Sequence, residues 1–117
     1  VDLDIEKGVF IFSGESRPEN APKFFDPIIE WLGDFKDMLE NKNEDYDLNV
    51  IFKLDYFNST STKYIVEISK QLKIIDELPN VSLKTEWHYK EIDEDIEESG
   101  RELIDWTGLE IEMVSFD

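Results

Sequence analysis

One stretch constrains the fold more than any other: residues 48–75 contain a strand pattern, a polar turn and a helix pattern. Residues 48–56 mix β-branched and aromatic residues with polar ones, as is typical of a strand in a half-buried sheet. From Tyr64 onward, apolar residues recur three and four positions apart, which predicts an amphipathic helix. We predict a turn over residues 57–63. The apolar positions of the helix are Ile65, Ile68, Leu72 and Ile75.

Four consecutive hydroxyl residues, at positions 59–62, stand where that strand ends and the helix begins. Serine and threonine oxygens accept hydrogen bonds from the unpaired N–H groups of a helix start, so the cluster suits a helix cap. The same N–H groups and the helix dipole favour added negative charge. Two interpretations therefore stand at this point: a cap alone, or a cap that includes a phosphorylation site.

Similar patterns predict the other elements of the chain. Asn20 followed by Pro22 is typical of a helix start, and Gly108 is typical of a helix end. The expected order is β-β-α-β-α-β-α-β, which predicts an α/β fold with a mixed, mostly parallel sheet of four or five strands and helices on one side. We expect a single domain over residues 1–117. The remaining predicted elements are a hairpin of residues 1–5 and 9–13, helices at 21–39 and 93–106, and strands at 81–89 and 109–116.

The strand at residues 81–89 has the clearest alternation in the chain. We expect one face of it to be buried and the other to meet water or a partner. The only histidine, His88, lies on the polar face, where we expect a solvated side chain rather than a metal ligand or catalytic base. The residues of the buried face are Val81, Leu83, Thr85, Trp87 and Tyr89.

The charge of the chain limits the classes of partner that it can bind. The 12 basic and 29 acidic residues give a net charge of −17. Nucleic acids and anionic membranes attract clustered lysine and arginine, so we expect neither as a partner. An acidic surface suits a protein partner with a basic patch, or serves solubility alone. No apolar run is long enough to cross a bilayer, and there is no cysteine. We expect a cytoplasmic protein.

Carboxylates are too common in this sequence for their pairing to identify a catalytic site. The acidic residues 93–98 lack the glycine and the terminal glutamate spacing of an EF-hand loop. The sequence has no phosphate-binding glycine loop, nucleophile elbow or histidine-based triad. We therefore expect no metal, no cofactor and no enzymatic activity. A small acidic enzyme or metal-binding domain is the alternative.

Two blocks of the sequence resemble the SiaC-type regulatory phosphoproteins, bacterial proteins whose shape is akin to STAS-type anti-anti-sigma factors. The first block is residues 13–21, followed by Phe24, Pro27 and the pair at 31–32; the second is residues 54–63. Weaker support comes from residues 87–89, followed by an acidic stretch and Gly100. The resemblance covers nearly the whole chain and implies a STAS-like fold.

The resemblance implies that the residue directly after Asn58, which is Ser59, is phosphorylated on its hydroxyl by a dedicated protein kinase. A PP2C-type phosphatase would remove the phosphate. Family members carry threonine at the position of Ser59, whereas in this chain the threonine follows one residue later. Thr60 is therefore a rival acceptor. The unphosphorylated form of such proteins binds and activates a diguanylate cyclase in cyclic di-GMP signalling. A constitutive interaction domain, with the hydroxyl cluster as a cap only, is a third interpretation.

Parallel strands would bring the loop at residues 18–20 to the same sheet edge as Ser59. We therefore expect both segments to contribute to one partner-binding surface. Its expected residues are Pro18, Glu19, Asn20, Phe57, Asn58, Ser59, Thr60 and Ser61.

Overall fold

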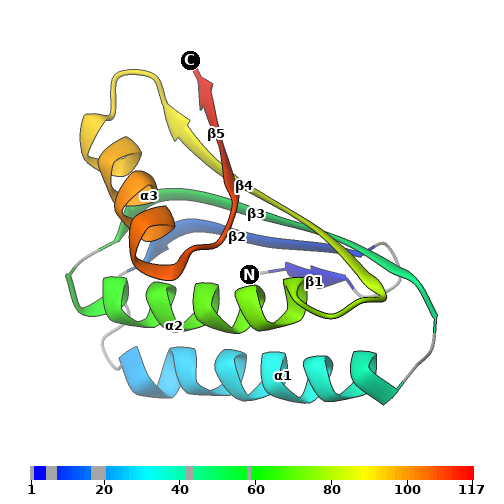
Figure 1. The fold of residues 1–117 in the computed structure, drawn as a ribbon. Helices are drawn as coiled ribbons and strands as arrows, with labels where there is room; N and C mark the ends of the chain where they lie inside the picture. Colours follow the sequence, from blue (N-terminus) through cyan, green and yellow to red (C-terminus); the bar gives the residue numbers. More distant parts are fainter. Residues whose placement is uncertain (1, 5–7, 17–20, 42–43, 58) are drawn as a thin grey trace.

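The computed structural model describes residues 2–4, 8–16, 21–41, 44–57 and 59–117 (Figure 1). Strands and helices follow one another in the predicted order β-β-α-β-α-β-α-β. The strands are β1 (Asp2–Asp4), β2 (Val9–Ser16), β3 (Tyr46–Phe57), β4 (Val81–Lys90) and β5 (Ile111–Phe116). The helices are α1 (Ala21–Asn41), α2 (Ser59–Asp76) and α3 (Glu94–Thr107).

The strands form one sheet, and their order across the sheet is the same as their order along the chain. β1 pairs antiparallel with β2, as the predicted hairpin requires. From β2 to β5 every neighbouring pair is parallel, and a helix connects each of these pairs. A parallel pair needs such a crossover because a short turn only reverses the chain. The predicted mixed, mostly parallel sheet is confirmed.

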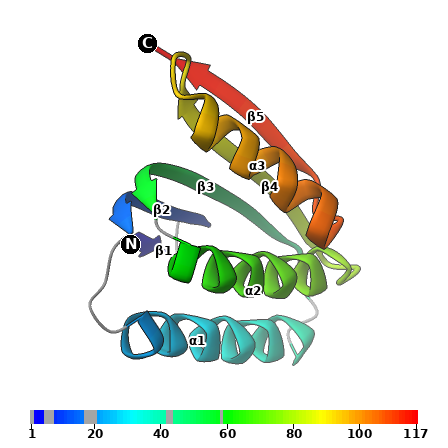
Figure 2. The same cartoon turned by 90° about the vertical axis from the view of Figure 1, so that its left-hand side faces the viewer.

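The core lies between the sheet and the helices, which pack on the same face of the sheet (Figure 2). Phe10 of β2 is fully buried, and its ring lies 5.3 Å from that of Trp31 and 5.2 Å from that of Phe35, both in α1. Trp87 of β4 is buried beneath α3 and donates a hydrogen bond to it. α2 lies between α1 and α3 and contacts both. Its apolar stripe Ile65, Ile68, Leu72 and Ile75 is buried, as predicted.

The start of α2 differs from the prediction. The spacing of apolar residues predicts a helix from Tyr64, but the helix begins at Ser59. Hydroxyl side chains weaken a helix interior because they compete for backbone hydrogen bonds. In the first turn that competition costs little, since the N–H groups there have no intrahelical acceptor. The hydroxyl residues therefore form the first turn of α2 instead of a separate loop before it.

Both ends of α3 lie within one residue of the predicted range, 93–106. Asp93 precedes the helix, and its Oδ1 accepts a hydrogen bond from the N–H of Ile96 at 3.1 Å. At the other end Gly108 has a φ of 71°, and its N–H donates to the Ile104 carbonyl at 2.9 Å. An acidic cap and a left-handed glycine are the usual ways to satisfy the groups that a helix leaves unpaired at its ends.

The face of the sheet that points away from the helices carries His88. The prediction of a solvated histidine is wrong: the side chain is only 23% exposed, and Nε2 lies 3.4 Å from Oε1 of Glu86. β4 has a strand on each side, and Val114 of β5 stands directly opposite His88. Neighbouring side chains therefore shield a residue in the middle of the sheet even where no helix covers it.

Candidate functional site

The predicted site residues that the structure describes lie where β3 ends and α2 begins. Phe57 is the last residue of β3, and the first turn of α2 contains Ser59, Thr60 and Ser61. Ser59 is the first residue of the helix, which is the position expected for a group that interacts with the unpaired N–H groups. Asn58, Pro18, Glu19 and Asn20 lie outside the described residues.

The ends of β2 and β3 lie side by side. Ser16, the last residue of β2, pairs with Phe57, the last residue of β3. The register shifts between Gly14, which pairs with Leu54, and Glu15, which pairs with Tyr56, so β3 has one extra residue opposite this step of β2. α1 begins five residues after Ser16 and α2 begins two residues after Phe57. Both helices therefore start from the same edge of the sheet (Figure 1).

An aromatic pair joins the two helix starts. The ring of Phe25 in α1 stacks on that of Tyr64 in α2, with centroids 5.0 Å apart and planes 5° from parallel. Phe25 is 2% exposed, so the contact belongs to the edge of the core. This pair was not predicted from the sequence. The sequence feature that could have indicated the pair is an aromatic residue near the start of each helix, at the fifth position of α1 and the sixth of α2.

The charge at these two helix starts is unusual for so acidic a chain. Neither α1 nor α2 has an acidic residue in its first turn, whereas α3 has three. Carboxylates are favoured near the positive end of a helix, as the first turn of α3 illustrates. Exposed lysines stand near the starts of α1 and α2 instead: Lys23 in the first turn of α1, and Lys63, whose Nζ lies 5.5 Å from the Tyr64 ring centroid. The positive ends of these helices thus have no acidic side chain from their own first turn.

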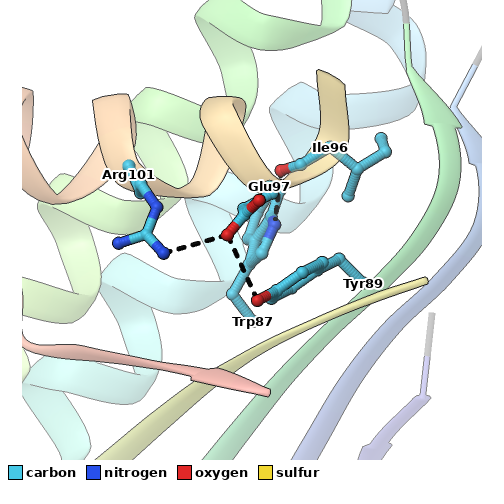
Figure 3. Close-up of polar contacts among 5 residues, drawn as sticks. All are labelled: Trp87, Tyr89, Ile96, Glu97 and Arg101. Atoms are coloured by element: carbon cyan, nitrogen blue, oxygen red, sulfur yellow. Dashed lines mark hydrogen bonds and ion pairs between the residues drawn. The ribbon is translucent and has the colours of Figure 1, made fainter. Parts of the chain in front are cut away.

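A second set of contacts fixes α3 on β4 (Figure 3). Trp87 Nε1 donates to the Ile96 carbonyl at 2.9 Å, and the Tyr89 hydroxyl donates to Glu97 Oε2 at 3.3 Å. The guanidinium of Arg101 bonds the same carboxylate oxygen at 2.9 Å, and this bond raises the pKa of Arg101. β4 therefore holds α3 through one buried hydrogen bond and one partly exposed network.

The acidic stretch that opens α3 forms no compact ligand cluster. Asp93 caps the helix, and Glu97 bonds Tyr89 and Arg101. Among the described residues, no group of three or more histidine, aspartate or glutamate side chains is arranged to hold a metal ion. Across the same part of the chain, no helix combines the length and hydropathy needed to cross a membrane.

Comparison with known proteins gives one family. Residues 1–116 match the profile described as "SiaC family regulatory phosphoprotein". No curated protein sequence matches the chain.

Solved structures share its fold. The crystal structure of apo-SiaC from Pseudomonas aeruginosa aligns with a TM-score of 0.74 and 24% identity, covering 95% of this chain and 85% of that one. SiaC in the crystal structure of diguanylate cyclase SiaD in complex with its activator SiaC, from the same organism, aligns with a TM-score of 0.78 and 24% identity. That alignment covers 97% of this chain and 88% of the other. At this identity the likeness establishes a common fold.

Proposed function

We propose, because this chain belongs to the SiaC family of regulatory phosphoproteins, that it is a non-enzymatic binding protein whose partner binding is switched by phosphorylation of Ser59. In this proposal residues 1–117 act as one regulatory domain in the cytoplasm. A protein kinase adds the phosphate, and a PP2C-type phosphatase removes it. The effector is a diguanylate cyclase, as it is for the SiaC of Pseudomonas aeruginosa.

One observation carries the proposal: α1 and α2 start at the same sheet edge, and their first turns contain no acidic residue although the chain carries a net charge of −17. A phosphate on Ser59 would meet the unpaired N–H groups and the positive end of the α2 dipole. Lys63 is four residues further along the same helix, which places it on the same side of α2. The edge can therefore accept a dianion without strain on the fold.

The effect of the phosphate on binding follows from desolvation. Phosphorylation adds a charge of roughly −1.5 to −2 and three acceptor oxygens. A partner that packs over Phe57 and Ser59 in the unphosphorylated form would have to remove water from this group, and burying an uncompensated charge is strongly unfavourable. A penalty of about 3 kcal/mol weakens binding roughly 100-fold. The phosphate would therefore release the effector while the fold stays intact.

The experiment has two parts. First, the purified chain is incubated with extract of its host cells and ATP, and the modified residue is located by tandem mass spectrometry. Second, the affinities of the wild type, Ser59→Ala, Ser59→Glu and Thr60→Ala for the purified diguanylate cyclases of the host are measured by biolayer interferometry. Thermal unfolding of each variant serves as a control, since loss of one hydroxyl group at the helix start should cost about 1 kcal/mol or less.

We expect phosphate on Ser59, its loss in Ser59→Ala and its retention in Thr60→Ala. One cyclase should bind the wild type and Ser59→Ala equally well and bind Ser59→Glu at least tenfold more weakly. Phosphate that persists in Ser59→Ala but disappears in Thr60→Ala would move the acceptor to Thr60. Equal binding of wild type and Ser59→Glu, together with no phosphate on either residue, would overturn the switch.

A further inference from the structure

A small pocket lies between α2 and α3, and we call it the α2–α3 pocket. Its floor is apolar and consists of Ile65 from α2, Trp87 from β4 and Leu103 from α3, each at most 3% exposed. The hydrogen bond from Trp87 to the Ile96 carbonyl fixes the indole in this floor. The pocket is therefore built from residues that the core holds in place.

The rim of the α2–α3 pocket contains both polar and aromatic residues. Thr62 of α2 and Glu102 of α3 line it, together with Trp106 in the last turn of α3. Trp106 is 56% exposed, although a tryptophan side chain is usually largely buried. Tryptophan is also the residue type most enriched at the energetic centres of protein interfaces. An exposed indole beside an apolar pocket therefore marks this surface as a candidate interface.

The size of the α2–α3 pocket limits what it can hold. Its volume is about 70 Å³, whereas pockets for small molecules and cofactors usually measure about 300–1,000 Å³. A nucleotide or cofactor does not fit. A single aliphatic side chain, presented by a polypeptide that lies across the rim, is the occupant of suitable size.

The charges around the rim indicate which charge the residues beside the aliphatic side chain of the occupant should carry. Glu98, Glu102 and Asp105 are exposed and follow one another at spacings of four and three, so they form one acidic stripe along α3 beside Trp106. Arg101, on the same helix, is bonded to Glu97. On the α2 side, Lys63 extends toward the Tyr64 ring, which stacks on α1 and so faces away from α3.

We propose that the α2–α3 pocket and the acidic stripe beside it bind a segment of a partner protein in which one aliphatic residue is flanked by lysine or arginine. The aliphatic side chain enters the pocket, and the basic residues pair with the acidic stripe. An arginine can also stack on the exposed face of Trp106. This inference rests on the proposed function in one respect: it takes the occupant to be a protein that a regulatory chain binds.

The position of this surface relates it to the phosphorylation site. Thr62 follows Ser59 by three residues in α2, so the two positions are neighbours on one side of the helix. A segment seated in the α2–α3 pocket lies one helical turn from the acceptor. A phosphate there is close enough to act on the same bound partner.

The experiment is an NMR titration of the full, unphosphorylated ¹⁵N-labelled chain with a synthetic peptide that has one leucine flanked on each side by two arginines. A peptide with glycine in place of the leucine controls for the anchor. Two charge-reversal variants with equal net charge are compared: Glu102→Lys at the rim, and Glu77→Lys, an exposed residue just after the far end of α2. Trp106→Ala is the third variant, and its fold is checked by the spectrum itself.

We expect saturable shifts at the Trp106 indole N–H and the Thr62 and Glu102 amides. The apparent Kd should rise at least tenfold for the glycine peptide, for Glu102→Lys and for Trp106→Ala, and less than twofold for Glu77→Lys. Equal weakening by the two charge reversals, or equal binding of the two peptides, would overturn the proposal. Neither result depends on a kinase. The pocket proposal can therefore fail while the switch at Ser59 stands, and the switch can fail while the pocket proposal stands.

Discussion

The backbone of Gly100 in α3 lies directly against the indole of Trp87 in β4. A methyl group built on Gly100 would stand 2.6 Å from Cδ1 and 2.7 Å from Nε1 of that ring, closer than carbon atoms in proteins approach one another. Trp87 is 1% exposed and hydrogen-bonded to the carbonyl of Ile96, so it has no room to move aside. The absence of a side chain at Gly100 is therefore what lets α3 approach the sheet.

This contact predicts opposite effects of one substitution at two helical glycines. Alanine usually stabilises a helix by about 1 kcal/mol relative to glycine. At Gly33 in α1 an added methyl group meets no atom within 4 Å, so Gly33→Ala should raise the free energy of unfolding by about 0.5–1 kcal/mol. Gly100→Ala should instead lower it by about 2 kcal/mol, because overpacking outweighs the helix propensity.

Urea unfolding of both variants and the wild type measures this difference. The near-ultraviolet circular dichroism of Gly100→Ala should also change, since the environment of the Trp87 indole is disturbed. A Gly100→Ala protein as stable as Gly33→Ala would show that α3 is not held at the distance described here.

The two glycines with positive φ provide a second matched pair. Gly8 has a φ of 66° and Gly108 a φ of 71°. At Gly108 a methyl group has open space, so Gly108→Ala should cost only the backbone strain of about 1–2 kcal/mol. At Gly8 the methyl group would also collide with the backbone carbonyl of Asp47, and Gly8→Ala should cost at least about 3 kcal/mol.

Thermal and denaturant unfolding of the two variants distinguishes these costs. Gly8 also accepts a hydrogen bond from the N–H of Asn49 at 2.7 Å, so its displacement would weaken the junction between β2 and β3. A Gly108→Ala protein as strongly destabilised as Gly8→Ala would show that the collision with the Asp47 carbonyl adds no cost at Gly8.

The net charge of −17 predicts a response to salt. Self-repulsion among so many carboxylates destabilises the compact state, and salt screens it. Raising NaCl from 20 mM to 300 mM should increase the free energy of unfolding by roughly 1 kcal/mol, or about 4 °C in Tm. Calorimetry at constant pH tests this. A Tm that falls with salt would mean that favourable ion pairs, such as Arg101 with Glu97, outweigh the repulsion.

The sequence alone predicts much of this fold because several local signals agree. The alternation in β4 identifies Thr85 and Trp87 as inward-facing, and both are buried. Asp93 and Gly108 mark the ends of α3 through capping chemistry that acts within a few residues. Such features depend on neighbours in the chain, so their pattern is visible without knowledge of the tertiary structure.

Other features depend on contacts between distant residues and are not visible in the sequence. Ser59 begins α2 because the first turn of a helix tolerates hydroxyl residues, and apolar spacing does not report that turn. The stacking of Phe25 on Tyr64 and the packing of Gly100 on Trp87 follow only from the arrangement of the helices on the sheet. The same holds for the α2–α3 pocket, whose residues come from three separate elements.

The order of the strands has a consequence for how this molecule is made. Each strand joins the outer side of the one before it, so a chain that leaves the ribosome with its N-terminal end first can extend the sheet one strand at a time. Among the described strands, none has to be inserted between two that are already paired. The unit of α3 and β5 follows the other described elements and pairs only with β4, so its addition leaves the earlier pairings undisturbed.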